Sequence, residues 1–520
     1  MTMKNAMVIG IVGSVIFCVL CGVNLTGQGL YYDEIHQASA AFTWLGKEPI
    51  AFSRAVIGGV PLLNMTYSGA LKSHAYGFYL RFIGGGHFSV LSWRCLSLGF
   101  VALGIFLFCL IGGPRLGPRG LLLFLALLLS DITVLLTSRH DWGPTALALA
   151  LRLIFLAVWL HGEKLSRGTS TNVFVLGALV GLSIYEKLSS VVLLAPLYLI
   201  LLTRPSRSVR AWAIAPAGLF AGTLPLLLAN ACTWVGGHGL ISLEPNPPYP
   251  PVAWSTFAGN YLSLGQGREA WLWILGRIAN PLFSQLEAGL VVGICLLIAW
   301  MVIRDRQFRP AGLCIASYVL VAILVKVLPG KTYLHHWILG TPFQYLAVAL
   351  AMSGAGDRSR WSHRFMAAAV CVLLLLRLPA VISTEHALAR GQAANRFDRS
   401  LTQLGEFAGR HPNDLFIATT WGTAMQMYCL SDGQPDHVFE AFWDAGRVEA
   451  LKAILKRKDK RILYLSELPR AANLSADLTA RAVKTVEESA EWREVPVDSE
   501  LSNLAAVRVQ KFERMPARQP

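Results

Sequence analysis

Charged residues are scarce in this sequence. Asp, Glu, Lys and Arg make up 15% of its 520 residues, whereas hydrophobic residues make up 54%. A soluble globular protein usually carries about 25% charged residues. Together with a mean hydropathy of +0.49, this shortage of charge excludes an ordinary soluble domain and predicts a polytopic membrane protein.

Cysteine patterns that hold metals or build disulfide frameworks are also absent. Of the nine cysteines, eight lie in or beside apolar runs, and Cys429 stands alone in the C-terminal region. The one CxxC spacing, Cys18 to Cys21, lies inside the first apolar run and has no second Cys or His pair, so no spacing predicts zinc binding. The sequence contains no internal repeat, no long low-complexity tract and no nucleic-acid-binding module. We therefore expect no nucleic-acid partner, even though the net charge is +15.

Apolar runs dominate the first three quarters of the chain. A membrane-spanning helix needs roughly 20 apolar residues, and the sequence predicts about eleven spans. They lie near residues 6–23, 95–112, 121–138, 145–161, 172–186, 188–203, 211–234, 286–303, 310–328, 336–353 and 364–383. The first run follows Lys4 and could be a secretory signal. Because no small-x-small cleavage site follows it, we interpret it as an uncleaved span.

Basic residues gather in alternate loops. They are Lys4; Arg115 and Arg119; Lys164 and Arg167; Arg204, Arg207 and Arg210; Arg304, Arg306 and Arg309; and Arg358, Arg360 and Arg364. The positive-inside rule places these loops and the N-terminus in the cytoplasm. The loops 24–94, 139–144, 235–285 and 329–335 and the turn near residue 186 then face outward, as does everything after about residue 384. We expect a multi-pass protein of the cell inner membrane.

The chain changes character at about residue 385. Charges become frequent, and residues 414–421, 437–442, 461–468 and 504–512 have the pattern of strands, whereas residues 446–458 form an amphipathic helical pattern. We therefore expect two domains. Residues 1–384 would form the transmembrane domain, and residues 385–520 a small α/β domain on the periplasmic or extracellular side.

Ionisable residues of the membrane region gather on the outward side. The first are Asp33 and Glu34, in the stretch GQGLYYDEIHQ at residues 27–37. Others come from several separate loops, which would converge on one cavity if the helices form a bundle. A carboxylate there could accept a proton from a hydroxyl group. Cations, or a divalent metal such as Mg, Mn or Zn held by carboxylates, could neutralise a departing phosphate.

Five short motifs occur in order along residues 5–385. YYDEIHQASAA contains Asp33 and Glu34, and YSGALKSHAYGFYLRFIGGGHFSVLSWRCLSL contains Lys72 and Arg94. SRHDWGPTALAL contains Asp141, and GLSIYEKLSSVVLLAPL contains Lys187. LPGKTYLHHWILGTPF contains Lys331, Tyr333, His335 and His336. In this order the motifs resemble the GT-C superfamily of polytopic glycosyltransferases, of the protein O-mannosyltransferase and lipid A aminoarabinose transferase type. Many relatives have Lys-Pro-Pro where this chain has Lys-Ser-His at residues 72–74.

This resemblance implies a GT-C-like fold and an inverting transfer of a sugar from a polyprenyl-phosphate donor. The acceptor would be an envelope glycolipid, polysaccharide or protein at the outer face of the membrane. Asp33 would be the general base, with Glu34 beside it and Asp141 as a second acidic group. The donor phosphate would be bound by Lys72, Arg94, Lys187 and Lys331. Further substrate or metal ligands could be His36, His74, Tyr333, His335 and His336.

Some of these residues have simpler interpretations. Asp141 precedes Trp-Gly-Pro, which is a natural helix start, so it could cap a helix with or without a role in a site. Asp131 and Arg152 lie about ten residues to either side of Asp141, which places both about 15 Å deep in the membrane. We expect them to form a structural ion pair.

A transporter or lipid flippase is the alternative function, because such proteins also combine many spans with buried charge. Transporters usually carry polar groups near the membrane midplane, often in repeated halves. This chain keeps most of its charge at one boundary and has no repeat. A non-catalytic relative that keeps its carboxylates for structure is a third possibility. The pattern favours an enzyme.

Overall fold

The chain folds into two compact units. The computed structural model describes residues 1–50, 54–164, 170–203, 209–237, 239–243, 252–328, 333–353, 360–394, 397–420, 422–441, 445–468 and 476–516. The membrane unit comprises Met1–Leu25, Met65–Gly69 and Arg94–Arg390. The mixed unit comprises Thr26–Asn64, Ala70–Trp93 and Gly391–Pro520. Its last segment begins near the expected boundary after residue 384, but two stretches of the first long loop also belong to it.

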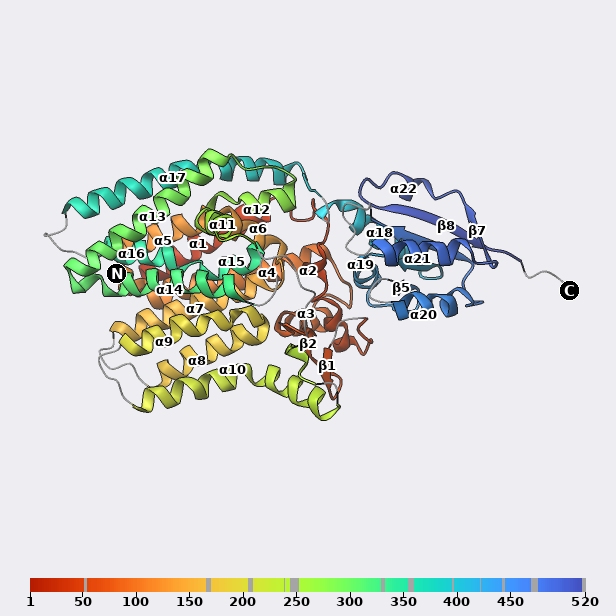
Figure 1. The fold of residues 1–520 in the computed structure, drawn as a ribbon, viewed down its shortest axis with the longest axis horizontal. Coiled ribbons are helices and arrows are strands. Elements are labelled where there is room, and N and C mark those ends of the chain that lie inside the picture. The colour runs from red at the N-terminus through yellow and green to blue at the C-terminus, as the bar shows by residue number, and fades with distance from the viewer. Residues whose placement is uncertain are drawn as a thin grey trace. The chain divides into compact units, whose positions relative to one another are not determined.

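Long helices make up the membrane unit and run side by side (Figure 1). They are α1 (Met3–Gly22), α4 (Val90–Leu107), α5 (Gly113–Leu129), α6 (Ile132–His140), α7 (Thr145–Lys164), α8 (Ser170–Glu186), α9 (Leu194–Thr203), α10 (Val209–Val235), α13 (Pro281–Arg304), α14 (Arg309–Val327), α16 (Phe343–Ser353) and α17 (Arg360–Ala389). Short pieces connect them: β3 (Ser68–Gly69), η2 (Phe108–Gly112), η3 (Leu188–Leu193), η4 (Ile241–Leu243), α11 (Trp254–Leu262), η5 (Leu264–Gln266), α12 (Arg268–Ala270), η6 (Trp271–Leu275), η7 (Arg306–Phe308), α15 (Leu334–Trp337) and η8 (Ile338–Gly340).

Seven helical stretches in the described part of the chain are long and apolar enough to cross a membrane. One of them, Val90–Leu129, comprises α4, η2 and α5, but the backbone at Gly117 is not helical, so this stretch is two helices joined at a kink. Two shorter apolar helices lie at Ser170–Glu186 and Leu188–Thr203. The expected run 121–138 is not one helix. It breaks at Asp131, whose carboxylate accepts the Val134 N–H at 3.0 Å and so caps α6. The polytopic α-helical fold class is confirmed.

Helices α8 and α10 lie unusually close together because glycines line their contact. A Cβ atom on Gly177 would lie 2.2 Å from the Ala215 carbonyl oxygen, and one on Gly222 would lie 2.3 Å from that of Ala178. The spacing is small-xxx-small on both helices, with Gly177 and Gly181 on α8 facing Gly218 and Gly222 on α10. Such spacing lets helix backbones approach each other inside a membrane.

A buried polar network lies among the helices of the membrane unit. Glu287 on α13 forms an ion pair with Arg377 on α17, and both side chains are almost fully buried. Arg377 also donates to the Tyr345 hydroxyl at 2.9 Å, and that hydroxyl donates to the Asp131 carboxylate at 2.6 Å. Charges at this depth are costly unless they are paired, so the network joins α13, α16 and α17 to the start of α6.

The expected ion pair between Asp131 and Arg152 is wrong. Asp131 is occupied by the Tyr345 hydroxyl and by its own helix cap. Arg152 instead donates to the backbone carbonyl oxygens of Thr341 at 3.0 Å and Ile338 at 3.4 Å, next to the break between η8 and α16. Residue counting gives the depth of each side chain in the membrane. It does not give the direction in which the side chain points from its helix, and that direction decides its partner.

Five strands form the sheet of the mixed unit, in the order β5-β4-β6-β8-β7. They are β4 (Leu415–Ala418), β5 (Val438–Glu440), β6 (Ile462–Glu467), β7 (Trp492–Val495) and β8 (Arg508–Arg514). Strands β5, β4 and β6 are parallel, with Phe416 opposite Tyr464, whereas β8 pairs antiparallel with both β6 and β7. The four expected strands are present as β4, β5, β6 and β8, and β7 is an addition.

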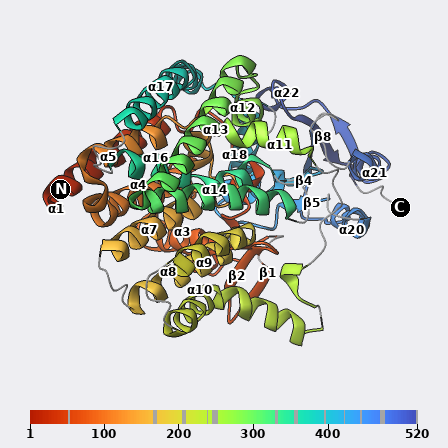
Figure 2. The same ribbon diagram turned by 60° about the vertical axis from the view of Figure 1, so that its left-hand side comes forward.

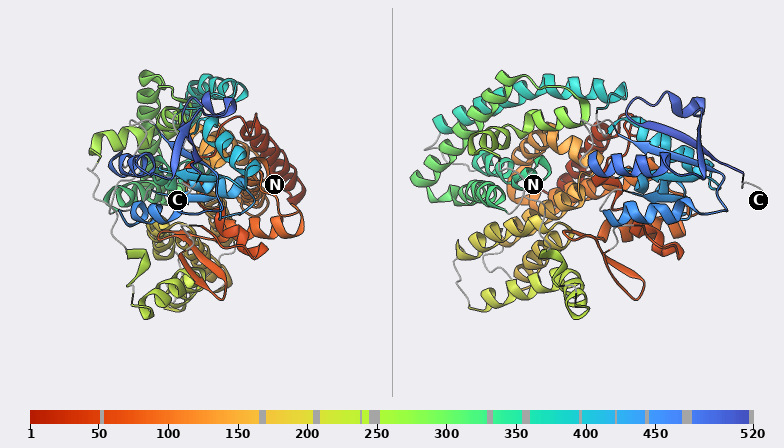
Figure 3. Two further views of the ribbon diagram at one scale, coloured as in Figure 1. Left: turned by 90° about the vertical axis from the view of Figure 1, so that its right-hand side faces the viewer. Right: turned by 45° about the vertical axis from the view of Figure 1, so that its right-hand side comes forward.

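Helices cover both faces of this sheet (Figure 3). They include α18 (Arg399–Arg410), α19 (Thr423–Leu430), α20 (Ala445–Leu455), α21 (Ala476–Glu487) and α22 (Ser499–Ser502). Alternate residues of the strands enter different cores, as the pleat requires. Leu415 and Ile417 pack in a core with Leu451 of α20, whereas Phe416 between them packs with Phe407 of α18. The expected α/β organisation is confirmed.

The first long loop contributes further elements to the mixed unit. They are α2 (Tyr32–Ile35), η1 (Ser39–Leu45), β1 (Arg54–Ile57), β2 (Val60–Met65) and α3 (Leu71–Phe82). Strands β1 and β2 form an antiparallel hairpin, which Figure 2 shows as two adjacent strands. Its two turn residues, Gly58 and Gly59, both have positive φ, as a tight two-residue hairpin turn requires.

Backbone contacts anchor this loop to the C-terminal segment. The Gly29 N–H donates to the Phe397 carbonyl oxygen at 2.8 Å, and the Gln426 side chain donates to the Leu30 carbonyl oxygen at 2.9 Å. A Cβ on Gly29 would lie 2.2 Å from the Asp398 carbonyl oxygen, so only glycine fits there. These contacts explain why residues 26–64 group with residues after 391.

Candidate functional site

The Asp-Trp-Gly-Pro turn between α6 and α7 is one focus of the predicted site. Asp141 and Gly143 both adopt positive φ, at 42° and 63°. The Asp141 carboxylate accepts the Ala146 N–H at 2.8 Å and so caps the start of α7. Its other oxygen lies 3.5 Å from the Ser97 hydroxyl. The capping interpretation of Asp141 is therefore correct, and the side chain is fully buried.

Lys187 meets this turn from the end of α8. Its ammonium group donates to the Gly143 carbonyl oxygen at 2.6 Å, and only 4% of the residue is exposed. The backbone is fixed there as well, because Lys187 forms a β-bridge with Ser68 and the Leu188 N–H donates to the Tyr67 carbonyl oxygen. The structure thus brings two of the predicted site residues, Asp141 and Lys187, into one buried cluster.

An aromatic wall adjoins the same turn. The His335 ring stacks on Trp142 with centroids 5.5 Å apart, and it also stacks on Tyr333 at 5.8 Å. The His336 ring nitrogen Nδ1 accepts the Tyr333 N–H at 3.2 Å, so this histidine caps α15. Lys331 lies outside the described residues. His335 therefore lies beside the turn that Lys187 contacts, with Tyr333 stacked behind it, and His336 supports the local backbone.

Two buried arginines hold the C-terminal end of α1. Arg94 donates to the Leu25 carbonyl oxygen at 2.7 Å. Arg139 donates to the carbonyl oxygens of Cys21, Val23 and Asn24 at 2.6–2.7 Å. Helix ends leave carbonyl groups unpaired, and basic side chains satisfy them. The motifs assign no role to Arg139, although it lies in the loop 139–144 that is expected to face outward.

Asp33 and Glu34 lie in the mixed unit, in the short helix α2. Glu34 is fully buried, and its carboxylate accepts the Tyr31 N–H at 3.4 Å. Asp33 is half-buried, so it is the carboxylate of this pair that remains partly accessible. Tyr31 stacks on Phe397 with centroids 4.6 Å apart, which ties α2 to the C-terminal segment. The neighbouring carboxylates therefore differ clearly in environment.

Lys72 and two histidines complete the predicted residues of the mixed unit. The Lys72 ammonium lies 3.7 Å from the centroid of the Trp93 ring, a cation–π contact at a fully buried side chain. His74 bridges Trp44 and the Pro61 carbonyl oxygen, at 3.2 and 2.8 Å, so both ring nitrogens are occupied. Burial lowers the pKa of His74 below its usual value. This environment suits a structural histidine.

The remaining histidine, His36, packs against its own helix. Its ring stacks on Tyr32 at 5.4 Å, and Nδ1 lies 3.3 Å from the Tyr32 carbonyl oxygen. In the part of the chain that the structure describes, no three His, Cys, Asp or Glu side chains meet in a group that could hold a metal ion.

The comparisons with known proteins bear on the fold. No protein-family model matches the chain, and a search of curated proteins gave no match. Among solved structures, the chain is similar to ArnT from Cupriavidus metallidurans bound to undecaprenyl phosphate, with a TM-score of 0.56 and 12% sequence identity. The match covers 96% of this chain and 97% of that one. The chain therefore has a polytopic membrane fold similar to that of this structure, as the resemblance of its five motifs predicted.

Proposed function

We propose that this protein is a membrane glycosyltransferase that takes its sugar from a polyprenyl-phosphate-linked donor. The observation that carries the proposal is the fold similarity over nearly the whole length to ArnT, a protein solved with undecaprenyl phosphate bound. The similarity includes the C-terminal unit as well as the helices, because it covers 96% of the chain. A buried lysine beside a capped turn, Lys187 at Gly143, is a second supporting observation.

The proposed reaction is an inverting displacement. A hydroxyl oxygen of the acceptor forms a bond to the anomeric carbon, while the bond from that carbon to the phosphate oxygen breaks. Asp33 takes the hydroxyl proton, and the electron pair leaves with the polyprenyl phosphate. The half-burial of Asp33, compared with the full burial of Glu34, favours Asp33 as the base and Glu34 as a residue that positions α2.

Cations would stabilise the departing phosphate. We assign this role to Lys72, Arg94 and Lys187, with Lys331 as a further candidate from the sequence. Positive groups fixed in a buried setting act strongly on charge that develops during a reaction. Lys187 is the best supported, because its backbone and its ammonium group are both fixed. Asp141 would act indirectly, by holding the turn that orients Lys187.

The acceptor would be an envelope glycolipid, polysaccharide or protein at the outer face of the inner membrane. We propose that the N-terminus is cytoplasmic and that residues 385–520 form an extracytoplasmic domain. The alternating basic loops support this orientation.

Transfer of a labelled sugar tests the proposal directly. Purified protein in nanodiscs would be supplied with a panel of polyprenyl-phosphate sugars, with a membrane extract as acceptor. We expect transfer from at least one donor and a loss of about 100-fold or more in Asp33→Asn, the scale of a lost general base. Glu406→Gln, an exposed acid on α18, is the matched control and should keep full activity.

Two outcomes would contradict the proposal. Undiminished transfer by Asp33→Asn would remove Asp33 as the base but leave the transferase function intact. Absence of transfer from every donor, together with substrate flux across liposomes, would instead favour the transporter or flippase.

A further inference from the structure

The strand order in the sheet of the mixed unit indicates where a ligand would ordinarily bind. The chain passes from β4 to β5 on one side and then to β6 on the other, so the direction of the connections reverses between β4 and β6. The helix after β4, α19, packs with α18 on one face, whereas α20 and α21 cover the opposite face. Open α/β sheets bind ligands outside the carboxyl ends of the strands where this reversal occurs. That place is the end of β4.

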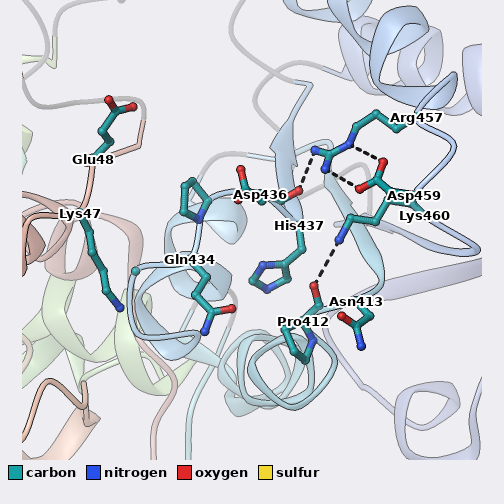
Figure 4. Close-up of a pocket in the computed structure, with 12 residues that line it drawn as sticks. Lys47, Glu48, Pro412, Asn413, Gln434, Asp436, His437, Arg457, Asp459 and Lys460 are labelled. Carbon is teal, nitrogen blue, oxygen red and sulfur yellow. Dashed lines mark hydrogen bonds and ion pairs between the residues drawn. The ribbon is translucent and has the colours of Figure 1, made fainter.

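A polar pocket of the mixed unit lies at the opposite ends of these strands (Figure 4). Its volume is about 680 Å³, and its lining includes Pro412 and Asn413 before β4, His437 before β5 and Lys460 before β6. Part of its wall therefore comes from the amino ends of the three parallel strands. The carboxyl end of β4 is occupied differently, by the first long loop of the chain.

Helix α2 lies against the turn that follows β4. This turn ends at Gly422, which is the N-cap of α19 and has φ of 85°. A Cβ atom on Gly422 would lie 2.5 Å from Cδ2 of Tyr32, so the two segments are in close contact. Tyr32 is the first residue of α2 and is only 2% exposed. The place where a ligand would ordinarily bind is therefore filled by the residue next to Asp33.

A closed ring of buried hydrogen bonds holds Leu30. Its N–H donates to the Thr402 hydroxyl at 2.9 Å, and its carbonyl oxygen accepts from the Gln426 side-chain amide at 2.9 Å. Thr402 in turn donates to the Gln426 amide oxygen at 3.3 Å. Leu30, Thr402 and Gln426 are each at most 4% exposed. Because side chains of α18 and α19 satisfy both backbone groups of Leu30, these two helices fix the chain just before Asp33.

Two further contacts fix the residues on either side of Leu30. Tyr31 stacks on Phe397 with ring centroids 4.6 Å apart, and the Gly29 N–H donates to the Phe397 carbonyl oxygen at 2.8 Å. Residues 29–32 are therefore each held by the segment after residue 391. Helix α2 itself has only four residues, and isolated helices shorter than about 12 residues are marginally stable in water. The position of α2 thus depends on these contacts.

We propose that Thr402 and Gln426 are positioning residues for Asp33, so that the α/β part of the mixed unit serves to hold the base in place. This inference rests on the proposed function, in which Asp33 takes the proton of the acceptor hydroxyl. A general base must lie within hydrogen-bonding distance of that proton, and misplacement by about 1 Å can lower a rate about 100-fold. Thr402 and Gln426 act through the backbone of Leu30, so they affect the rate of transfer rather than donor binding.

Hydrogen exchange on the full-length protein in nanodiscs, measured without any donor, tests the contacts. Thr402→Val removes the hydroxyl from a side chain of nearly the same shape, whereas Thr402→Ser keeps it. We expect amide exchange in residues 28–36 to be about fivefold faster or more in Thr402→Val and Gln426→Met, the scale of one lost hydrogen bond. Thr402→Ser should exchange as the wild type does. So should the matched control Thr485→Val, because that hydroxyl donates to Arg481 within α21.

Transfer kinetics separate a positioning role from a merely structural one. We expect kcat to fall about tenfold in Thr402→Val while KM for the donor stays within about twofold, and Thr402→Ser to restore kcat. In an Asp33→Asn background, Thr402→Val should cause no further loss, because the contact acts through Asp33. Thermal unfolding shows whether each variant remains folded; if Gln426→Met does not, Thr402→Val decides the matter.

Unchanged exchange in Thr402→Val would overturn the proposal whether or not the protein transfers sugar. Faster exchange with unchanged kcat, or a further loss on top of Asp33→Asn, would show that these contacts only stabilise the fold and would overturn the positioning role. Absence of transfer by the wild type would instead contradict the proposed function, and exchange alone would then decide whether Thr402 and Gln426 hold α2.

Discussion

The ammonium nitrogen of Lys187 lies 2.6 Å from the carbonyl oxygen of Gly143. This hydrogen bond links the end of α8 to the turn that Asp141 caps, and it fixes where a buried positive charge lies. Gly143 has φ of 63°, so the turn itself depends on a residue without a side chain. Two sequence motifs separated by 44 residues are thus joined at a single contact.

Loss of the Lys187 charge should weaken sugar transfer. We expect Lys187→Met to lower kcat/KM by about 100-fold, the scale of a charge-assisted contact to phosphate that is lost in the transition state. Lys187→Arg should recover only part of the activity. The planar guanidinium group keeps the charge but cannot donate to the Gly143 carbonyl oxygen in the same geometry as the compact ammonium group. Titration of each variant with undecaprenyl phosphate measures binding of the donor lipid separately from transfer. Lys452→Met, an exposed lysine on α20, should behave as wild type.

A bulky residue at Gly222 should destabilise the membrane unit. Gly222→Val would drive a side chain into the Ala178 carbonyl oxygen, and forced overpacking typically costs about 1–3 kcal/mol. Gly293→Val is the matched control, because Gly289 and Gly293 on α13 have the same spacing but face open space. Thermal unfolding in detergent should show a lower Tm for Gly222→Val alone. Equal Tm values for both variants would rule out the close contact of α8 and α10.

The buried pair of Glu287 and Arg377 should show partial rescue in a double variant. Removal of one partner leaves an unpaired buried charge and typically costs about 3–5 kcal/mol. We therefore expect Arg377→Leu to lower expression and Tm strongly, and Glu287→Leu with Arg377→Leu to recover most of the loss. Double-mutant analysis of Tm measures the coupling. If the double variant is as unstable as the sum of the single ones, the ion pair is not what stabilises this region.

Acid should weaken the mixed unit through His437. Burial and the nearby Lys460 lower the pKa of His437 to about 4, whereas an unfolded histidine has a pKa of about 6.5. The unfolded chain therefore binds more protons between these values, so the stabilisation is complete above about pH 6.5 and falls as the pH drops toward 4. Tm measured from pH 7 to pH 4.5 should decline more in the wild type than in His437→Gln. Parallel Tm curves would contradict this assignment.

The sequence predicted which segments form helices and strands better than it predicted which residues contact each other. Most of the expected apolar runs are helical, because length and hydropathy are properties of one segment, but the run 336–353 is interrupted between η8 and α16 and the run 121–138 between α5 and α6. The break at Asp131 was missed, since an acid inside an apolar run can be a cap or a buried charge with the same local pattern. The pairing of Asp131 with Arg152 failed for a related reason: depth follows from counting residues, whereas the facing neighbour depends on how helices pack.

The same difference between local patterns and long-range contacts applies to the candidate site. The motifs predicted which loops carry ionisable groups, and Asp141 and Lys187 both contact the turn between α6 and α7. Nothing in the spacing separates Gly218 and Gly222, which are packed, from Gly289 and Gly293, which are not. The roles of Arg139 and Arg377 also depend on carbonyl groups and acids more than 80 residues away, so no local pattern predicts them.

The docking of Gly29 against Phe397 and Asp398 imposes an order on biosynthesis. Ribosomes make residue 29 early, but its binding partners emerge only after three quarters of the polypeptide exists. The stretch with Asp33 and Glu34 therefore lacks its contacts with Phe397 and Asp398 while nearly all the helices are inserted. A nascent chain that ends near residue 390 would contain all of those helices, but Asp33 and Glu34 would not yet be held in their final position.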